Sequence, residues 1–375
     1  MTDSLQALID PIRAAAAAKT PLRIRGHGSK DFYGESPEGD LLDTISHSGI
    51  VTYEPTELVI TARAGTPLAE LEAALAEEGQ CLAFEPPRFD GRGTVGGMVA
   101  AGLSGPARAS VGGVRDYVLG VQLINGRAEH LTFGGQVMKN VAGYDVTRLT
   151  VGSLGILGVL TEVSLKVLPV MPLEATLVFE IDQAHALDQL NEWGAQPLPL
   201  NASCWVQGDA PLGEAGQLYV RLRGAAAAVN SAITKMTQEL PGDTMDNAQA
   251  GPGWQACRDQ TLPFFNAADH PGEALWRLSV PQTAPALNLP WPQLVEWHGG
   301  LRWVWAPESS LSKLRDLTQA VDGFTTLFRA ASAGDTRATS RFEPIESPLN
   351  QIHARLKAEF DPAHIFNPGR MIPSL

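Results

Sequence analysis

The sequence has little cysteine, a deficit of positive charge and no long hydrophobic run, and each shortage excludes a class of protein. Cys81, Cys204 and Cys257 are scattered over 375 residues, which argues against a disulfide framework and against a zinc or iron-sulfur site. Basic residues number 28 against 41 acidic ones, a formal net charge of -13, which disfavours nucleic acid and anionic membrane surfaces as partners. No stretch has the length and apolarity of a transmembrane helix, and residues 1–20 lack the apolar core of a signal peptide.

The length predicts two or three packed units rather than one. Pro169 and Pro172 follow a β-branched run and mark a boundary near residue 170. We therefore expect a first domain over residues 1–170, a second over 171–335 and a C-terminal segment over 336–375.

The first domain mixes helices with strands. Apolar spacing predicts helices over 4–18 and 66–80, and short apolar runs predict strands near 22–30, 41–46, 58–65 and 156–169. Asn125-Gly126 between two alternating runs is a strong hairpin signal.

In the second domain, apolar runs at 174–181, 216–224, 274–281, 301–307 and 324–330 alternate with helical stretches near 184–194, 225–240 and 309–321. That order predicts an antiparallel sheet backed by helices. All eight tryptophans lie in this part, either as a dense core, which we favour, or as a lid over a flat ligand.

The glycines at 91, 93 and 96 spell the G-x-G-x-x-G of dinucleotide-binding folds, but the context disagrees. A Rossmann motif needs a strand before the first glycine and a long helix after the third. Here two prolines precede Gly91, and Gly102, Gly105 and Pro106 end any helix after about two turns. The Rossmann reading is therefore rejected, and no P-loop motif occurs either.

Two glycine-rich segments remain as candidates for holding an anion. A short helix starting at Thr94 would offer free amides near Gly96 and Gly97 to a pyrophosphate. The loop 25–34, RGHGSKDFYG, would add a nest of amides beside two cations, Arg25 and Lys30. The alternatives are a turn required for close packing and cations that are merely solvated.

Several ordered motifs together resemble the FAD-binding domain of the vanillyl-alcohol oxidase and p-cresol methylhydroxylase superfamily. They are RGHGSKDFYG, FEPPRFDGRGTVGGMVAAGLSG, VGGVRDYVLGVQLING, GSLGILGVLTEVSLKVLP and the terminal FDPAHIFNPGRM. Within that superfamily the chain is most similar to the FAD-binding E subunits of bacterial glycolate oxidases. The resemblance implies an α+β fold: a two-part FAD-binding domain of p-cresol methylhydroxylase type and an antiparallel-sheet α+β cap domain. It also implies that the C-terminal segment returns to the FAD-binding domain.

The resemblance assigns a set of cofactor-binding residues. Those implied to hold or line FAD are Arg25, Gly26, His27, Gly28, Ser29, Lys30, Gly93, Thr94, Val95, Gly96, Gly97, Gly112, Arg115, Asp116, Gly155 and Leu160. Gly102 stands where the family often has Asn, and His27 stands where glycine is commoner and away from the flavin-linked His of covalent members. The FAD is therefore expected to be noncovalent. Lys139, Asn140, Tyr144 and Asp145 match a signature whose role the sequence leaves open between loop stabilisation and function.

Candidate catalytic residues are His298 and Arg302, a base and a carboxylate-binding cation for a 2-hydroxy acid. If residues 297–305 form one strand, these two lie on one face and Trp297, Trp303 and Trp305 on the other. The same pattern fits the polar and packed sides of an ordinary sheet.

The resemblance implies an FAD-dependent oxidoreductase acting on CH-OH groups, as one subunit of a cytoplasmic complex that could be peripheral at the inner membrane. The expected reaction is oxidation of glycolate to glyoxylate, with a D-type flavin subunit and an iron-sulfur subunit as partners, because the chain lacks both the H-x-G-D-x-N-x-H motif of D-type subunits and cluster ligands. No metal site is expected. A catalytically silent assembly subunit, or a self-sufficient FAD oxidase of another 2-hydroxy acid, stays open.

Overall fold

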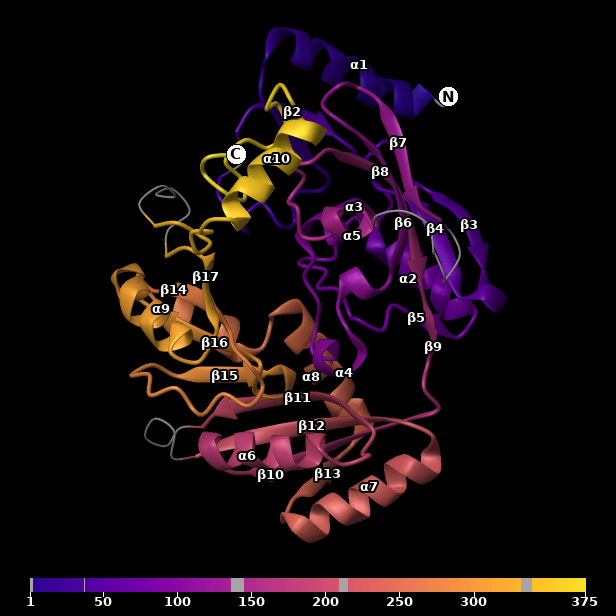
Figure 1. The fold of residues 1–375 in the computed structure, drawn as a ribbon. Helices are drawn as coiled ribbons and strands as arrows, with labels where there is room; N and C mark the ends of the chain where they lie inside the picture. Colours follow the sequence, from indigo (N-terminus) through magenta and orange to yellow (C-terminus); the bar gives the residue numbers. More distant parts are fainter. Residues whose placement is uncertain (1–2, 37, 136–144, 209–214, 332–338) are drawn as a thin grey trace. The chain divides into compact units, whose positions relative to one another are not determined.

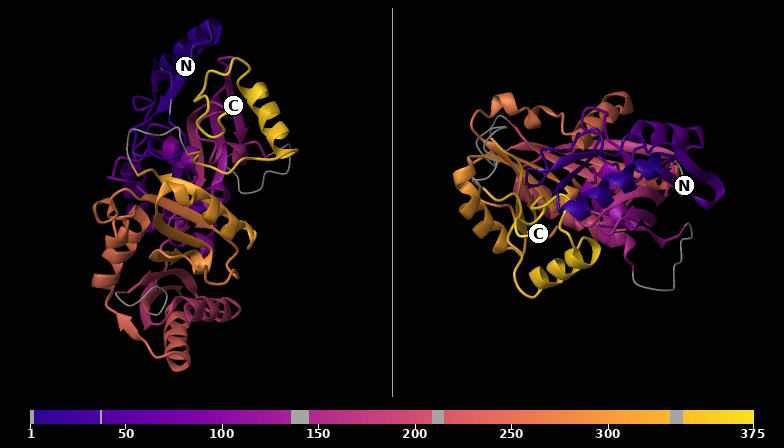
Figure 2. Two further views of the ribbon diagram at one scale, coloured as in Figure 1. Left: turned by 90° about the vertical axis from the view of Figure 1, so that its left-hand side faces the viewer. Right: turned by 90° about the horizontal axis from the view of Figure 1, so that it is seen from above.

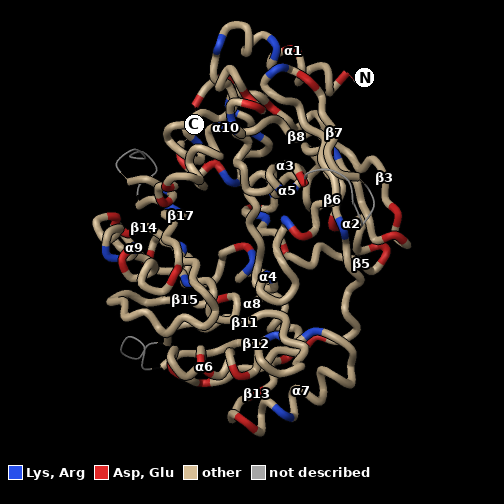
Figure 3. Tube along the Cα trace, in the orientation of Figure 1, with Lys and Arg blue, Asp and Glu red and all other residues tan. Residues whose placement is uncertain are grey.

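A computed structural model describes residues 3–36, 38–135, 145–208, 215–331 and 339–375, and the chain divides into two compact units. The first comprises residues 1–103, 113–169 and 344–375, and the second comprises 104–112 and 170–343. Residues 104–112, which fall inside the predicted first domain, thus group with the second unit. In both units Lys and Arg are interspersed with Asp and Glu (Figure 3).

The first unit is built from a five-stranded antiparallel sheet, a parallel strand pair and short helices (Figure 1). The sheet has the order β3-β4-β8-β6-β7, and β1 pairs with β2. Its strands are β1 Leu22–Arg25, β2 Asp40–Asp43, β3 Ile50–Glu54, β4 Val59–Arg63, β5 Gln80–Cys81, β6 Val118–Ile124, β7 His130–Gly134, β8 Val159–Lys166 and β9 Leu168–Pro169. Its helices are α1 Asp3–Ala18, α2 Leu68–Glu77, α3 Val95–Ala101, α5 Thr147–Thr150 and α10 Leu349–Phe360.

Local sequence accounts for several of these elements. The predicted helices at 4–18 and 66–80 are confirmed as α1 and α2, whose apolar stripes are buried. The predicted hairpin is confirmed as β6 and β7. Its turn is closed by Asn125, whose side-chain oxygen accepts hydrogen bonds from the amides of Arg127 and Glu129.

The C-terminal segment packs into the first unit. The amide of Leu22 donates to the carbonyl of Ile365 at 2.6 Å, and the amide of Asn367 donates to the carbonyl of Leu22 at 2.9 Å. Ile365 and Phe366 share a buried cluster with the apolar face of α1, and Figure 2 shows α1 and α10 at the same end of this unit. Residues more than 340 positions apart are therefore joined where β1 begins.

The second unit is an antiparallel sheet of eight strands in the order β13-β10-β12-β11-β15-β16-β14-β17. Its strands are β10 Leu173–Glu180, β11 Leu200–Gln207, β12 Gly216–Gly224, β13 Asp243–Met245, β14 Ala274–Ser279, β15 Gln293–Glu296, β16 Leu301–Ala306 and β17 Phe324–Arg329. Its helices are α4 Arg108–Val111, α6 Gln183–Gly194, α7 Ala226–Glu239, α8 Asn247–Asp259 and α9 Leu311–Gln319. One buried cluster joins α6 and α7 to β10, β11 and β12, and another joins α9 to β14, β16 and β17. The predicted α+β class with an antiparallel second sheet is confirmed.

The tryptophans of this unit form core rather than a lid. Trp193, Trp205, Trp276 and Trp305 are fully buried. Each of their indole N–H groups has an acceptor, for example the carbonyl of Ile181 for Trp205 at 2.9 Å. A buried indole needs such a partner to offset its desolvation.

Candidate functional site

The loop after β1 presents the backbone amides of four consecutive residues, 26–29. The amides of Gly26, His27, Gly28 and Ser29 bond to nothing in the part of the chain that the structure describes. Unpaired amides in a row are costly unless water or a ligand satisfies them, and such a row is a nest that favours an anion. This loop fits a phosphate group.

The loop is held in shape from within and from the C-terminus. Gly28 has φ +74°, and a side chain on it would collide with the guanidinium of Arg25. Arg25 is ion-paired with Asp31, its Nε lying 2.7 Å from Oδ2. Buried Arg370 donates to the backbone carbonyls of Lys30, Asp31 and Glu35. Arg370 lies in the C-terminal NPGR motif, so that motif braces the nest.

The second glycine-rich segment lies against the first. The ring Nδ1 of His27 donates to the carbonyl of Arg92 at 3.1 Å, and a side chain on Gly26 would meet Thr94 at 2.8 Å. Thr94 caps α3, and its hydroxyl accepts from the amide of Gly97. The two glycine-rich segments predicted to hold an anion, the loop 25–34 and the start of α3, are therefore adjacent.

The expectation of free amides at the start of α3 is wrong. The amide of Val95 donates to Thr66 O at 2.9 Å, that of Gly96 to Ala64 O at 2.8 Å and that of Gly97 to the hydroxyl of Thr94 at 3.2 Å. What α3 contributes is bare surface: a side chain on Gly97 would contact only Thr94. Within the described residues, the amides without an acceptor lie in the loop after β1, and α3 leaves space at Gly97.

A cavity of about 90 Å³ opens between these segments and can hold part of a larger ligand. Of the residues assigned from sequence, Gly26, Gly96, Gly97, Gly155 and Leu160 line it. The remaining lining residues are Ile24, Thr44, Ala64, Ala100, Leu123, Thr150, Ser153, Leu154, Leu157, Gly158 and Asn367. Asn367 was missed as a lining residue although its motif was noticed. Its side chain accepts from the amide of Ile24 and donates to the carbonyl of Leu154, so it joins two walls of the cavity.

The other assigned residues lie outside this cavity. Gly93 packs against Leu68, Gly112 ends α4, and Arg115 and Asp116 are exposed, with Asp116 accepting from the amide of Gly113. Lys30 lies over the ring of Phe89 at 5.5 Å. Lys139, Asn140 and Tyr144 fall outside the described residues, whereas Asp145 is ion-paired with Arg148.

His298 lies in a turn and not in a strand. Residues 297–299 form a one-turn 3-10 element, labelled η5, between β15 and β16, so the expected alternation through residue 298 is wrong. Trp297 and His298 both have positive φ, 57° and 54°, a conformation that is costly for residues with side chains and concentrates at functional sites. The ring Nδ1 of His298 lies 3.0 Å from the Ser203 hydroxyl and its Nε2 lies 2.9 Å from that of Ser110.

Burial lowers the pKa of His298 from 6.5 to about 4, so the ring is neutral near pH 7. Because the folded pKa is below the unfolded one, the unfolded chain binds more protons between pH 6.5 and about 4. His298 therefore lowers the free energy of unfolding by on the order of 3 kcal/mol as the pH falls through that window, and it has no such effect above pH 6.5.

We predict that His298→Asn flattens the pH dependence of the free energy of unfolding in that range. Asparagine is chosen because it tolerates positive φ. Denaturant titrations of both proteins at several pH values check this; parallel profiles contradict it.

The contacts of Arg302 are all with backbone carbonyls of its own unit. The side chain is fully buried in β16, and its three nitrogens donate to the carbonyls of Ala284, Pro285 and Gly299. Burial lowers its pKa to about 10, which keeps it charged at neutral pH. It fastens the proline-rich loop before β15, and the geometry gives no support to its assignment as a catalytic residue.

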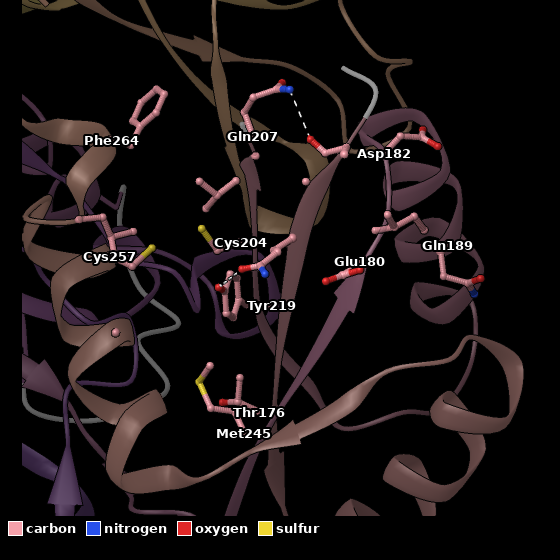
Figure 4. A pocket seen from close by; sticks show the side chains of 18 of the residues that line it. Thr176, Glu180, Asp182, Gln189, Cys204, Gln207, Tyr219, Met245, Cys257 and Phe264 are labelled. Atoms are coloured by element: carbon pink, nitrogen blue, oxygen red, sulfur yellow. Dashed lines mark hydrogen bonds between the residues drawn. The ribbon is translucent and has the colours of Figure 1, made fainter. Parts of the chain in front are cut away.

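A larger cavity of about 1330 Å³ lies in the second unit. Figure 4 shows Cys204 of β11, Tyr219 of β12 and Cys257 of α8 in its wall. Its acidic lining residues are Glu180, Asp182, Asp188 and Glu192. Among the described residues that line it there is no Lys or Arg, and His185 is paired with Asp182, so the lining is acidic on balance.

Comparisons with known proteins agree with this geometry. A family model described as FAD binding domain matches residues 2–148. The chain is 44% identical over 373 residues to glycolate oxidase subunit GlcE of Escherichia coli (strain K12), covering 100% of this chain and 99% of the relative. It is 32% identical over 174 residues to glycolate oxidase subunit GlcD of Bacillus subtilis (strain 168), 46% of this chain and 37% of that one.

A solved structure of alkyldihydroxyacetonephosphate synthase has the same fold. It superposes with a TM-score of 0.67 at 14% identity, covering 96% of this chain and 75% of that one. No helix within the described residues combines the length and apolarity needed to cross a membrane.

Proposed function

The chain belongs to the glycolate oxidase subunit family of GlcE, with an FAD-binding domain, and from that premise we propose that it is an FAD-binding subunit of a complex that oxidises glycolate to glyoxylate. The family assignment makes it an FAD-dependent oxidoreductase that acts on CH-OH groups. Bound FAD would supply the two-electron acceptor for that oxidation.

The observation that carries the proposal is a row of four amides, at residues 26–29, that have no acceptor among the residues the structure describes and that lie beside a glycine-lined cavity. In a protein of net charge -13, an anion must be held by groups that act at short range. Backbone dipoles meet that requirement, because they need no basic surface. The amides at 26–29 would hold the diphosphate, and Gly97 and Gly155 would let the cofactor approach the backbone.

Three further side chains, one of them assigned from the sequence, would support this site without touching the reacting atoms. Arg25 and Arg370 fix the nest, and Asn367 fixes the wall at Leu154. Electrons would pass to an iron-sulfur subunit, in a complex that also contains a D-type flavin subunit. The similarity to two differently named glycolate oxidase subunits, GlcE and GlcD, supports an enzyme of more than one subunit.

The test is the visible spectrum of the full-length protein and of its complex. The protein purified alone is expected to carry oxidised flavin that acid precipitation releases, as a noncovalent cofactor would be. The complex purified from its native host is expected to be bleached by glycolate without oxygen. A colourless protein that does not take up added FAD would remove the proposal. Bleaching of the isolated chain by glycolate would show that this chain oxidises the substrate without partners.

A further inference from the structure

The sheet of the second unit is packed on one face and hollow on the other where β10, β12 and β11 lie side by side. Leu177 of β10 and Leu218 of β12 belong to the buried cluster formed with α6 and α7. Their neighbours Thr176 and Tyr219 alternate to the opposite face and line the cavity of about 1330 Å³. Helix α8 packs on this second face, where the Trp254 indole donates to the Thr176 hydroxyl at 2.9 Å. The cavity is therefore the part of a sheet face that the described residues leave uncovered.

Several half-buried apolar side chains meet in this cavity. They include Val206, Tyr219, Leu240, Met245, Leu262 and Phe264. In Figure 4, Phe264 lies on one side of the cavity, and Asp182 and Gln189 lie on the other. A single half-buried apolar residue is ordinary on a protein surface, whereas several around one hollow are typical of a binding surface. The cavity thus offers an apolar floor to a ligand.

The charges around this floor are acidic. Glu180 ends β10, and Asp188 and Glu192 are exposed on α6. These three carboxylates form no ion pair with a lysine or arginine in the described ranges of the chain. The fourth, Asp182, is paired with His185, whose Nδ1 lies 2.5 Å from its Oδ2. A ligand that complements both features carries apolar groups together with positive charge.

The size of the cavity favours a polypeptide as that ligand. Small molecules bind in hollows of roughly 300 to 1,000 Å³, and this cavity measures about 1330 Å³. A second copy of this chain is disfavoured, because each copy has a formal net charge of -13 and would bring more acid to an acidic lining. The chemistry of the cavity thus selects a different and basic partner.

We propose that this cavity docks a basic amphipathic segment of a partner polypeptide. Apolar side chains of that segment would lie on the sheet face, and its Lys or Arg side chains would reach Glu180, Asp188 and Glu192. Long basic side chains suit such a rim, because their methylene stems lie along apolar surface while their charged ends reach the carboxylates. The expectation that the partner is another subunit of a glycolate-oxidising complex rests on the proposed function, whereas the docking site itself does not.

The first experiment is calorimetric titration of the full-length chain with an amphipathic helical peptide of leucine and lysine. We expect Asp188→Lys/Glu192→Lys to weaken binding of this peptide about 10- to 30-fold, because each substitution replaces an exposed attraction with a repulsion of similar size. The uncharged Asp188→Asn/Glu192→Gln is expected to weaken it about 3- to 6-fold. The matched control is Glu70→Lys/Glu77→Lys, which makes the same change in net charge at exposed positions of α2. It is expected to bind the peptide as the wild type does.

Two further probes test the nature of the occupant. A leucine and glutamate peptide has the apolar groups with the wrong charge, and spermine has the charge without the apolar groups, so the wild type is expected to bind both far more weakly. Spermine binding as tight as that of the leucine and lysine peptide would indicate a small-cation site and overturn the inference. A wild-type dimer that Asp188→Lys/Glu192→Lys dissociates would assign the cavity to a second copy and overturn it as well.

Thermal melts establish that each variant is folded. A folded Asp188→Lys/Glu192→Lys protein with wild-type affinity for the peptide, or a wild type that does not bind it, contradicts the docking site. Both positions are exposed, and if the double variant nevertheless fails to fold, Asp188→Asn/Glu192→Gln decides by the same criterion.

The complex purified from the native host separates this inference from the proposed function. Asp188→Lys/Glu192→Lys is expected to lose a partner subunit and to keep the flavin content of the wild type. A complex that stays intact in this variant overturns the inference and leaves the proposed function standing. A chain that binds the leucine and lysine peptide in this cavity but takes up no FAD upholds the docking site and rejects the proposed function.

Discussion

Gly97→Asp is expected to abolish retention of FAD while leaving the fold intact. Gly97 lines the cavity, and a side chain there meets only the Thr94 hydroxyl. A carboxylate about 4 Å from a phosphate repels it by about 4 kcal/mol at an effective dielectric constant of about 20, which corresponds to about 1000-fold in affinity. Flavin absorbance after purification, followed by titration of the apoprotein with FAD, measures the loss.

The position makes the substitution selective for the cofactor. Gly97 is the third residue of α3, and an acidic side chain in the first turn of a helix is favourable for the helix itself. Gly97→Asn adds nearly the same volume without charge and is expected to weaken FAD binding far less. Gly251→Asp, at a glycine with open space around it in α8, controls for the change in net charge. FAD retention equal to that of the wild type in Gly97→Asp would show that no phosphate lies here.

Lys357→Met is expected to destabilise the protein by about 3 to 5 kcal/mol, the range for breaking a buried ion pair from one side. Lys357 and Asp361 are fully buried at the end of α10. The Lys357 Nζ donates to Asp361 Oδ2 at 2.7 Å and to the carbonyls of Ile156 and Phe366 at 2.8 Å. Without the ammonium, the carboxylate and two carbonyls are left buried with fewer partners. Urea unfolding monitored by tryptophan fluorescence measures the change.

An exposed pair of the same spacing provides the control. Lys235 and Glu239 also lie four residues apart, at 2.6 Å, but on the surface of α7. Lys235→Met is therefore expected to change stability by less than about 1 kcal/mol. A loss below about 1 kcal/mol in Lys357→Met would show that the buried pair does not hold the C-terminal segment, the clamp that its contacts with Ile156 and Phe366 suggest. Because Asn367 and Arg370 follow this clamp, we also expect Lys357→Met to retain FAD less well.

The sequence predicted those elements that are specified by their own residues, through apolar spacing, turn residues or helix caps. The apolar stripe of α2 and the Asn125-Gly126 turn between β6 and β7 need no distant partner to be recognised. The short α3 also follows from its own residues, since Thr94 caps it and Gly102 ends it with φ +64°. The rejection of a Rossmann fold rested on the same local geometry.

Elements that depend on distant packing escaped prediction. Helix α8 contains Gly251, Pro252 and Gly253, a combination that disfavours helix. It forms because its own residues Trp254 and Cys257 are buried in the unit. The Trp254 indole also donates to the hydroxyl of Thr176 in β10. The turn at residues 297–299 also departs from the strand alternation expected through residue 298, because the His298 ring lies between the hydroxyls of Ser203 in β11 and Ser110 in α4.

The sequence by itself determined where glycine leaves the backbone bare and that any bound anion must be held without a basic surface. Tertiary structure decided which amides are available to hold that anion. The amides of α3 are occupied by the carbonyls of Ala64 and Thr66, whereas those at 26–29 meet no carbonyl at all within the described chain. A hydrogen-bond donor is free or occupied according to which acceptor the fold brings beside it, and that acceptor belongs to another part of the chain.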